Sequence, residues 1–113
     1  MATASEKGIQ VSTRRLAETV ELRFDGLDTV VTVRVYECLT PDFEKGRYEF
    51  DTSHFVQTPT QAGPYISSRN REDSLDATLR RGIETITSFI EGAQRVGHVP
   101  SDTWFVRNEF FVS

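Results

Sequence analysis

Asp51 and His54 stand close together in the run Asp-Thr-Ser-His, where an acid beside an imidazole could form a catalytic pair. A general base must lie within hydrogen-bond reach of the group it serves. On an extended strand, however, residues three positions apart point to opposite faces of the sheet. Unless a bulge intervenes, we therefore expect His54 to be a hydrogen-bonded histidine of the core rather than a base.

Glu49 and Asp51 fall on one side of the same predicted strand, about 7 Å apart by strand geometry, which could suit paired catalytic carboxylates. General acid catalysis would need the pKa of one of them to be raised. The arginines expected on that face, Arg23, Arg34 and Arg47, would instead keep both carboxylates ionised. The sequence therefore predicts no catalytic residue and favours a protein that is not an enzyme.

Metal-binding and redox chemistry have little support in the sequence. The chain holds one cysteine, Cys38, and two histidines, His54 and His98, which are scattered along it. Their spacing matches no set of metal ligands, and a single cysteine cannot form an internal disulfide. We expect no metal and no cofactor, and we expect Cys38 to be an inert thiol at the end of a strand.

Residues 67–71, Ser-Ser-Arg-Asn-Arg, are the best local candidate for a binding site because they precede a predicted helix. Backbone N–H groups at a helix N-terminus, together with arginines and hydroxyls, could hold a phosphate or carboxylate. Acidic residues at positions 72, 73 and 76 already occupy the same electrostatic position. The contacts expected for a small anion or ligand are Tyr65, Ser67, Arg69 and Arg71.

The elements that position these residues follow from the hydrophobic period. Apolar residues recur at every second position from 19 to about 56, at every third or fourth from 75 to 93, and at every second again from 104 to 112. The pattern predicts an α+β fold: an antiparallel sheet of about four strands with one long helix packed on one face, in the order β-β-β-α-β. We expect a flexible tail over residues 1–8 and a single domain over 9–113.

Asp25-Gly26 between two alternating runs is the clearest hairpin signal. Either a two-residue turn or a four-residue loop keeps every side chain on the same face, because the two registers differ by two residues. A short extra strand over residues 9–15 is a further expectation. The side chains predicted to point inward are Val20, Leu22, Phe24, Val31, Val33 and Val35.

The remaining elements are a third strand over residues 47–57, a long loop over 57–70, the helix, and a last strand over 104–112. Asn70 is a plausible N-cap of the helix, Gly97 is a natural stop, and Gly82 would allow a close approach to the sheet. The predicted core side of the helix is Leu75, Leu79, Ile83, Ile86, Phe89, Ile90 and Ala93. The predicted core side of the last strand is Trp104, Val106, Asn108, Phe110 and Val112.

The second face of the sheet carries the strongest functional hint, because aromatic residues and arginines are expected there together. Such a surface is typical of single-strand nucleic-acid binders, which also need a net positive field. Here the predicted charges are four positive and four negative, which argues against nucleic acid as a partner and suits either a protein interface or a solvated, ion-paired sheet. The outward aromatic residues favour the protein interface slightly. The residues expected to form it are Arg34, Tyr36, Phe55, Phe105, Arg107 and Phe111.

The 113 residues carry a net charge of −4 and contain neither a secretory signal nor a membrane-spanning run, so a cytoplasmic protein without a membrane partner is expected. A helix longer than the strands would leave an apolar overhang suited to a second subunit. The leading hypothesis is a non-catalytic interaction or regulatory module, a homodimer or subunit of an assembly. The alternative is a small-ligand or anion-binding protein, or a small enzyme, that uses the 57–70 loop and the helix N-terminus.

Overall fold

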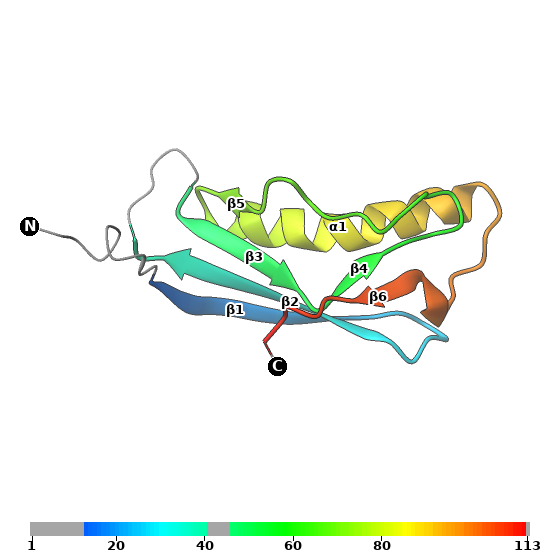
Figure 1. Ribbon diagram of the computed structural model, residues 1–113, viewed down its shortest axis with the longest axis horizontal. Helices are drawn as coiled ribbons and strands as arrows, with labels where there is room; N and C mark the ends of the chain where they lie inside the picture. Colours follow the sequence, from blue (N-terminus) through cyan, green and yellow to red (C-terminus); the bar gives the residue numbers. More distant parts are fainter. Residues whose placement is uncertain (1–12, 41–45, 113) are drawn as a thin grey trace, which may run out of the picture.

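One long helix lies along one face of a four-stranded antiparallel sheet, and a separate two-stranded sheet extends one end of this arrangement (Figure 1). The computed structural model describes residues 13–40 and 46–112. The elements are β1 (Arg14–Arg23), β2 (Val30–Cys38), β3 (Tyr48–Thr52), β4 (His54–Val56), β5 (Arg71–Glu72), α1 (Leu75–Arg95), the 3-10 helix η1 (Asp102–Trp104) and β6 (Phe105–Arg107).

The sheets are ordered β1-β2-β3-β5 and β4-β6. The predicted α+β class and the order β-β-β-α-β are confirmed. The expected tail, residues 1–8, lies outside the described residues. No helix in the described ranges combines the length and the hydropathy that crossing a bilayer requires.

The β1–β2 hairpin has the register of the four-residue loop, with Leu22 opposite Val31. Gly26 has a φ of 80°, which glycine adopts without strain, and the Leu27 N–H closes the turn onto the Phe24 carbonyl at 3.1 Å. β1 begins earlier than the predicted hairpin strand, so residues 14 and 15 of the expected extra strand belong to it. A register shift between Leu16 and Glu18 marks a β-bulge.

The third predicted strand breaks at Ser53 into β3 and β4. Ser53 is held to β2 twice, because its N–H donates to the Thr32 carbonyl at 2.9 Å and its Oγ accepts the Thr32 N–H at 2.8 Å. Asn108 then donates hydrogen bonds to the carbonyls of Thr52 and Ser53. β4 consequently leaves β2 and pairs with β6. Alternation continues across the break, since Phe50, Thr52 and Val56 are all buried.

The helix begins later than predicted. Ser74 caps it, with its Oγ accepting the Ala77 N–H at 3.1 Å. Asn70 is not the N-cap, because its carbonyl accepts the Phe50 N–H at 3.0 Å and its side-chain amide donates to the Phe50 carbonyl at 3.2 Å. This pairing draws residues 71 and 72 into the sheet as β5.

The other end of α1 matches the expected stop. The N–H groups of Gly97 and His98 donate to the carbonyls of Gln94 and Ala93, each at 3.0 Å, which is the hydrogen-bond pattern of a Schellman motif. His98 therefore caps the helix through its backbone.

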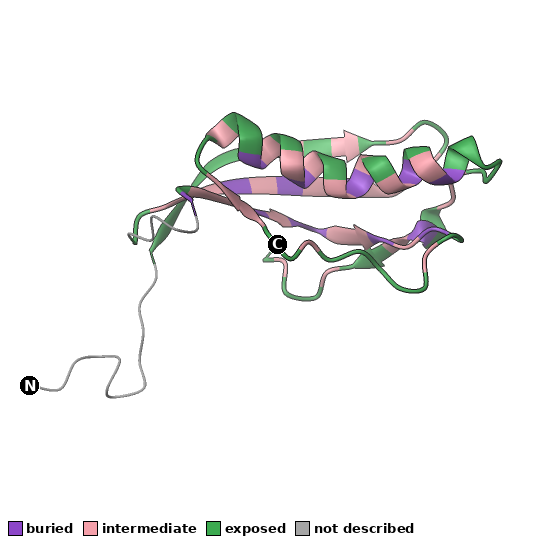
Figure 2. Cartoon of the chain, turned by 90° about the horizontal axis from the view of Figure 1, so that it is seen from above, coloured by how far each residue is buried: buried purple, intermediate pink, exposed green. Residues whose placement is uncertain are grey.

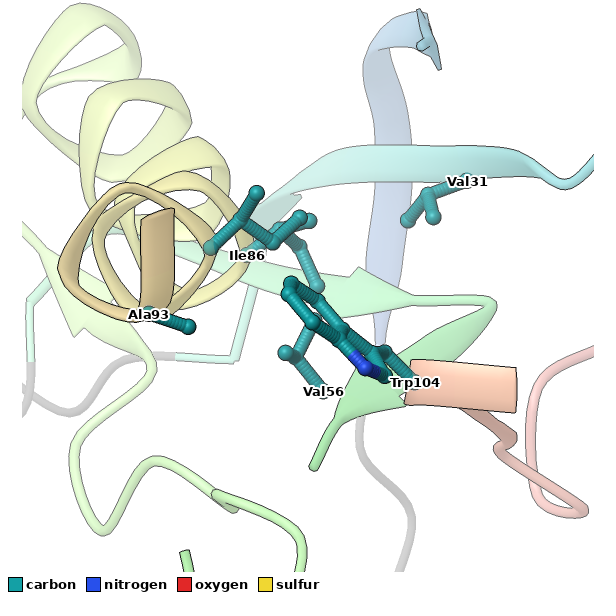
Figure 3. Packing of buried hydrophobic residues seen from close by; sticks show 6 residues of the cluster. Val31, Val56, Ile86, Ala93 and Trp104 are labelled. Atoms are coloured by element: carbon teal, nitrogen blue, oxygen red, sulfur yellow. The ribbon is translucent and has the colours of Figure 1, made fainter. Parts of the chain in front are cut away.

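The buried side of α1 differs from the predicted arc in its first half (Figure 2). Ile86, Ile90 and Ala93 are buried as expected, and Phe89 packs against the core that they form. Thr78 and Gly82 face the sheet in place of Leu79 and Ile83, which remain partly exposed. The core cluster at the second half of the helix consists of Val31, Val56, Ile86, Ile90, Ala93 and Trp104 (Figure 3).

The predicted last strand is mostly wrong. Its first residue, Trp104, is buried as expected but closes the 3-10 helix η1, and β6 is only three residues long. Because a 3-10 helix has three residues per turn and not two, the alternation restarts after it, and Phe105 rather than Val106 faces the core. Phe110 and Val112, predicted to point inward, are 92% and 68% exposed.

Candidate interaction surface

The face of the main sheet opposite α1, called the outer face here, carries a cluster centred on Arg14. Its guanidinium lies 3.8 Å from the centre of the Tyr36 ring and reaches Glu49 at 2.9 Å and Asp51 at 3.2 Å. Partial burial disfavours the charge of Arg14, but the hydrogen bond that Arg14 donates to Glu49 and the negative charges of both acids outweigh this effect and raise the pKa of Arg14. The two carboxylates thus share one cation, as expected for an ion-paired surface, although Arg14 was not among the predicted residues.

The C-terminal segment lies across the same face of the sheet, as its path beneath β2 in Figure 1 shows. The Arg34 guanidinium stands 4.5 Å from the centre of the Phe111 ring and also donates to the Val112 carbonyl. Arg34 and Tyr36 are alternate residues of β2 and pair with Asp51 and Glu49 of β3. Three of the six residues predicted for the interface, Arg34, Tyr36 and Phe111, therefore do share the outer face.

Asn108 fixes the path of that segment. Its N–H donates to the Ser53 carbonyl at 2.9 Å and its side-chain amide to the Thr52 carbonyl at 2.8 Å. Its own side-chain and backbone oxygens accept the N–H groups of Phe110 and Phe111, each at 3.1 Å. Residues 108–111, called the Asn108 turn here, consequently hold the Phe110 side chain 92% exposed on an anchored backbone.

The other three predicted interface residues lie elsewhere. Phe55 pairs with Val106 in the two-stranded sheet, on the side away from the buried Val56. Phe105 packs against the core cluster, with its ring centre 5.2 Å from that of Phe24, so its predicted outward orientation is wrong. Arg107 is exposed, but it pairs with His54 and so shares the side of β6 that Phe105 occupies. The shift at η1 causes both differences.

His54 and Ser53 form the nearest approach to a nucleophile–base pair, with Nδ1 and Oγ 2.8 Å apart. Ser53 is buried, and its Oγ already accepts the Thr32 N–H. A substrate in solvent therefore could not reach this hydroxyl. Burial lowers the pKa of His54, and the positive charge of Arg107 lowers it further, so the ring is neutral near pH 7. The His54 and Phe105 rings are nearly perpendicular, at 87°, with their centres 6.4 Å apart. His54 is hydrogen-bonded as the sequence predicted, but it is only partly buried and lies outside the core cluster.

The predicted anion site does not form at a helix N-terminus, because α1 starts at Leu75 and Ser74 caps it. Arg69 instead pairs with Glu72 at 3.2 Å, and Arg71 donates twice to the Gly46 carbonyl, at 2.7 and 3.2 Å. The Ser67 hydroxyl donates to the Arg69 carbonyl at 2.6 Å. The polar groups of these three residues are thus engaged by neighbouring parts of the chain, where they hold the 57–70 loop and β5 in place.

Tyr65 borders a depression of about 260 Å³ beside the helix, which none of those three residues lines. Its ring packs on Phe89, with centres 4.6 Å apart, and its N–H donates to the Val56 carbonyl at 3.0 Å. The rest of the lining comes from α1: Arg81, Glu84, Thr85, Ser88 and Phe89. Since Arg81 is paired with Glu72 at 2.7 Å, the depression has little spare positive charge for an anion.

Cys38 and the acidic residues offer no metal-binding arrangement. Partial burial and the negative charge of Glu49 raise the pKa of the Cys38 thiol, which keeps it protonated and weakly nucleophilic. Across residues 13–40 and 46–112, no three side chains of His, Cys, Asp or Glu gather closely enough to hold a metal ion.

Comparisons with known proteins add no functional information. No protein-family model matches the chain, and no curated protein or solved structure matches it either.

Proposed function

We propose that this protein is a non-catalytic interaction module that binds a protein partner through the outer face of its sheet and the Asn108 turn, as a homodimer or as a subunit of an assembly. The observation that carries the proposal is Phe110. Its aromatic side chain is 92% exposed, and contact between so much apolar surface and water is unfavourable. Burying this side chain at an interface would therefore contribute favourably to the free energy of binding. Because the Asn108 hydrogen bonds hold the turn, little conformational entropy is lost when a partner covers it.

The charges on the outer face indicate the kind of partner. Arg14 is neutralised by Glu49 and Asp51, and Arg34 is covered by Phe111. A polyanion would need several uncompensated cations in a row, because phosphate contacts dominate nucleic-acid affinity. A protein surface with apolar residues and charges of both signs fits this face better.

A capture experiment with two single variants tests the proposal. Phe110→Ser should abolish capture of the partner that the intact protein retains, and Val99→Ser is the matched control, since Val99 is also apolar and 82% exposed but lies between α1 and η1. Both side chains face solvent, so neither change should alter the unfolding transition. Capture of the same partner by Phe110→Ser would refute the proposal.

The alternative, a small-ligand protein, is favoured by one observation, the depression beside Tyr65. Its volume of about 260 Å³ lies just below the usual range for small-molecule sites. Phosphate titration followed by amide resonances tests the anion form of this idea. Shifts confined to Tyr65, Arg81 and Ser88 would support it, and unmoved resonances there would count against it.

A further inference from the structure

β1 is the longest strand and stands at the edge of the main sheet. Within residues 13–40 and 46–112, β2 is its one pairing neighbour, and residues 14–19 are all exposed. The N–H and C=O groups along such an edge can accept another strand. The edge also carries an apolar side chain, Leu16, which is 53% exposed.

The hydrogen bonds of β2 show which β1 groups point to the open edge. On the β3 side, the Cys38 N–H donates to the carbonyl of Arg47, the residue before β3, and the Thr32 carbonyl accepts the Ser53 N–H. On the β1 side, the Leu39 N–H donates to the Thr13 carbonyl. In an antiparallel ladder these directions alternate, so β1 residues opposite the even-numbered positions of β2 turn their backbone groups outward. The Thr19 N–H agrees, because it donates to the neighbouring Glu18 carboxylate at 3.2 Å. The outward-directed residues are Arg14, Leu16, Thr19, Glu21 and Arg23.

We propose that a second copy of this chain pairs with β1 along this edge, antiparallel, across a two-fold axis between Ala17 and Glu18. A two-fold axis at this point pairs each even-numbered residue of one β1 with an odd-numbered residue of the other. The bulge allows this pairing, because the outward-directed residues are even-numbered before Ala17 and odd-numbered after it. Arg14 then lies opposite Glu21 of the partner subunit, and Leu16 lies opposite Thr19 of the partner subunit. All of these residues have outward backbone groups, so the ladder can form on both sides of the axis.

Charge selects this register over its neighbours. Arg14 faces a Glu21 of opposite charge on each side of the axis and adds this contact to its existing bonds with the carboxylates of its own β3. A register centred on Glu21 would instead set two carboxylates against each other. Glu21 is available, since its existing partner is Arg23, two residues away, with side chains that are 52% and 73% exposed. The two main sheets become one continuous sheet, with both outer faces on the same side.

This dimer gives a structure to the self-association within the proposed function and does not depend on partner binding at Phe110. Sedimentation velocity of the intact protein at about 0.1 mM should show twice the chain mass. Thr19→Pro removes an outward N–H without touching a β1–β2 hydrogen bond and should yield a monomer. Glu21→Arg should weaken the dimer about tenfold, because it replaces two attractive pairs by two repulsive ones.

Two controls separate this interface from other surfaces. Glu91→Arg makes the same charge reversal on the exposed side of α1 and should leave the dimer intact, as should Phe110→Ser. Circular dichroism checks that each variant is folded, and Glu21→Arg suffices if Thr19→Pro fails to fold. A monomeric intact protein, or a dimer that survives Glu21→Arg unchanged, would overturn the inference.

Discussion

Gly82 of α1 lies directly over Val33 of β2: a Cβ at position 82 would stand 2.9 Å from Cγ1 of Val33 and 3.1 Å from the Phe50 ring. Val33 is fully buried and Phe50 nearly so, which leaves neither side chain room to move. Gly82→Ala should lower the free energy of unfolding by about 1 kcal/mol, because overpacking of about 1–3 kcal/mol exceeds the helix-propensity gain of about 1 kcal/mol. Urea denaturation measures the change.

Gly92 is the matched control for that substitution. It lies in the same helix, and a Cβ there would have no neighbour within 4 Å. Gly92→Ala should therefore raise the free energy of unfolding by about 0.5–1 kcal/mol. Equal effects of the two substitutions would contradict the close approach of α1 to the sheet.

Gly46 supports the start of β3 from a position that no other residue can occupy well. Its φ is 100°, and a Cβ would lie 2.8 Å from the carbonyl carbon and oxygen of Glu72. Gly46→Ala should cost at least about 2 kcal/mol, since backbone strain and a clash with the β5 backbone add together. Gly26→Ala has the strain without the clash and should cost less. Thermal unfolding of both variants compares the two losses of stability. A smaller loss for Gly46→Ala than for Gly26→Ala would contradict the prediction.

The hairpin and the helix could be predicted because their signals are local. Alternation fixes which side of β2 is buried whatever the loop length, and Val31, Val33 and Val35 are indeed all inaccessible. The close approach at Gly82 could also be inferred, because a glycine beside an apolar stripe has few other structural roles in a helix.

The strand break and the C-terminal segment could not be predicted because they depend on contacts distant in sequence. Asn70 looked like a helix cap but binds Phe50, and Asn108 looked like a strand residue but binds the carbonyls at 52 and 53. One signal was available for the missed Phe110: an asparagine two residues before it favours an Asx-turn. This signal predicts that the last strand ends before Asn108 and that Phe110 points outward.

His54 should make stability depend on pH near neutrality. Its pKa in the folded protein is lowered by burial and by Arg107, whereas the unfolded chain titrates at about 6.5. Between those two values the unfolded state binds more protons, so the free energy of unfolding should fall as pH decreases through 6.5 toward the folded pKa. His54→Gln should remove this decline, which urea denaturation at about pH 7.5 and 5.5 detects. A folded-state pKa above 6.5 in a titration of the His54 ring resonances would contradict the prediction.

Asp102 should make a separate, more acidic contribution, because it ties the hairpin loop to η1. Its Oδ1 accepts the Thr29 hydroxyl at 2.6 Å and the N–H groups of Thr29 and Asp28 at 2.8 and 3.1 Å. The hydrogen bonds from the hydroxyl and the N–H of Thr29 lower the pKa of Asp102. A carboxyl with a lowered folded pKa stabilises the protein above its unfolded pKa, and this contribution disappears as pH falls through the folded pKa.

Asp102→Ala should therefore be less stable than the intact protein at pH 7, and the difference between them should shrink toward about pH 3. Asp28→Ala is the control, because it removes a neighbouring carboxylate but keeps the backbone N–H that Asp102 accepts. Urea denaturation at several pH values gives both curves. A difference that stays constant with pH would mean that Asp102 acts through packing alone, since only the ionised carboxylate accepts all three hydrogen bonds at full strength.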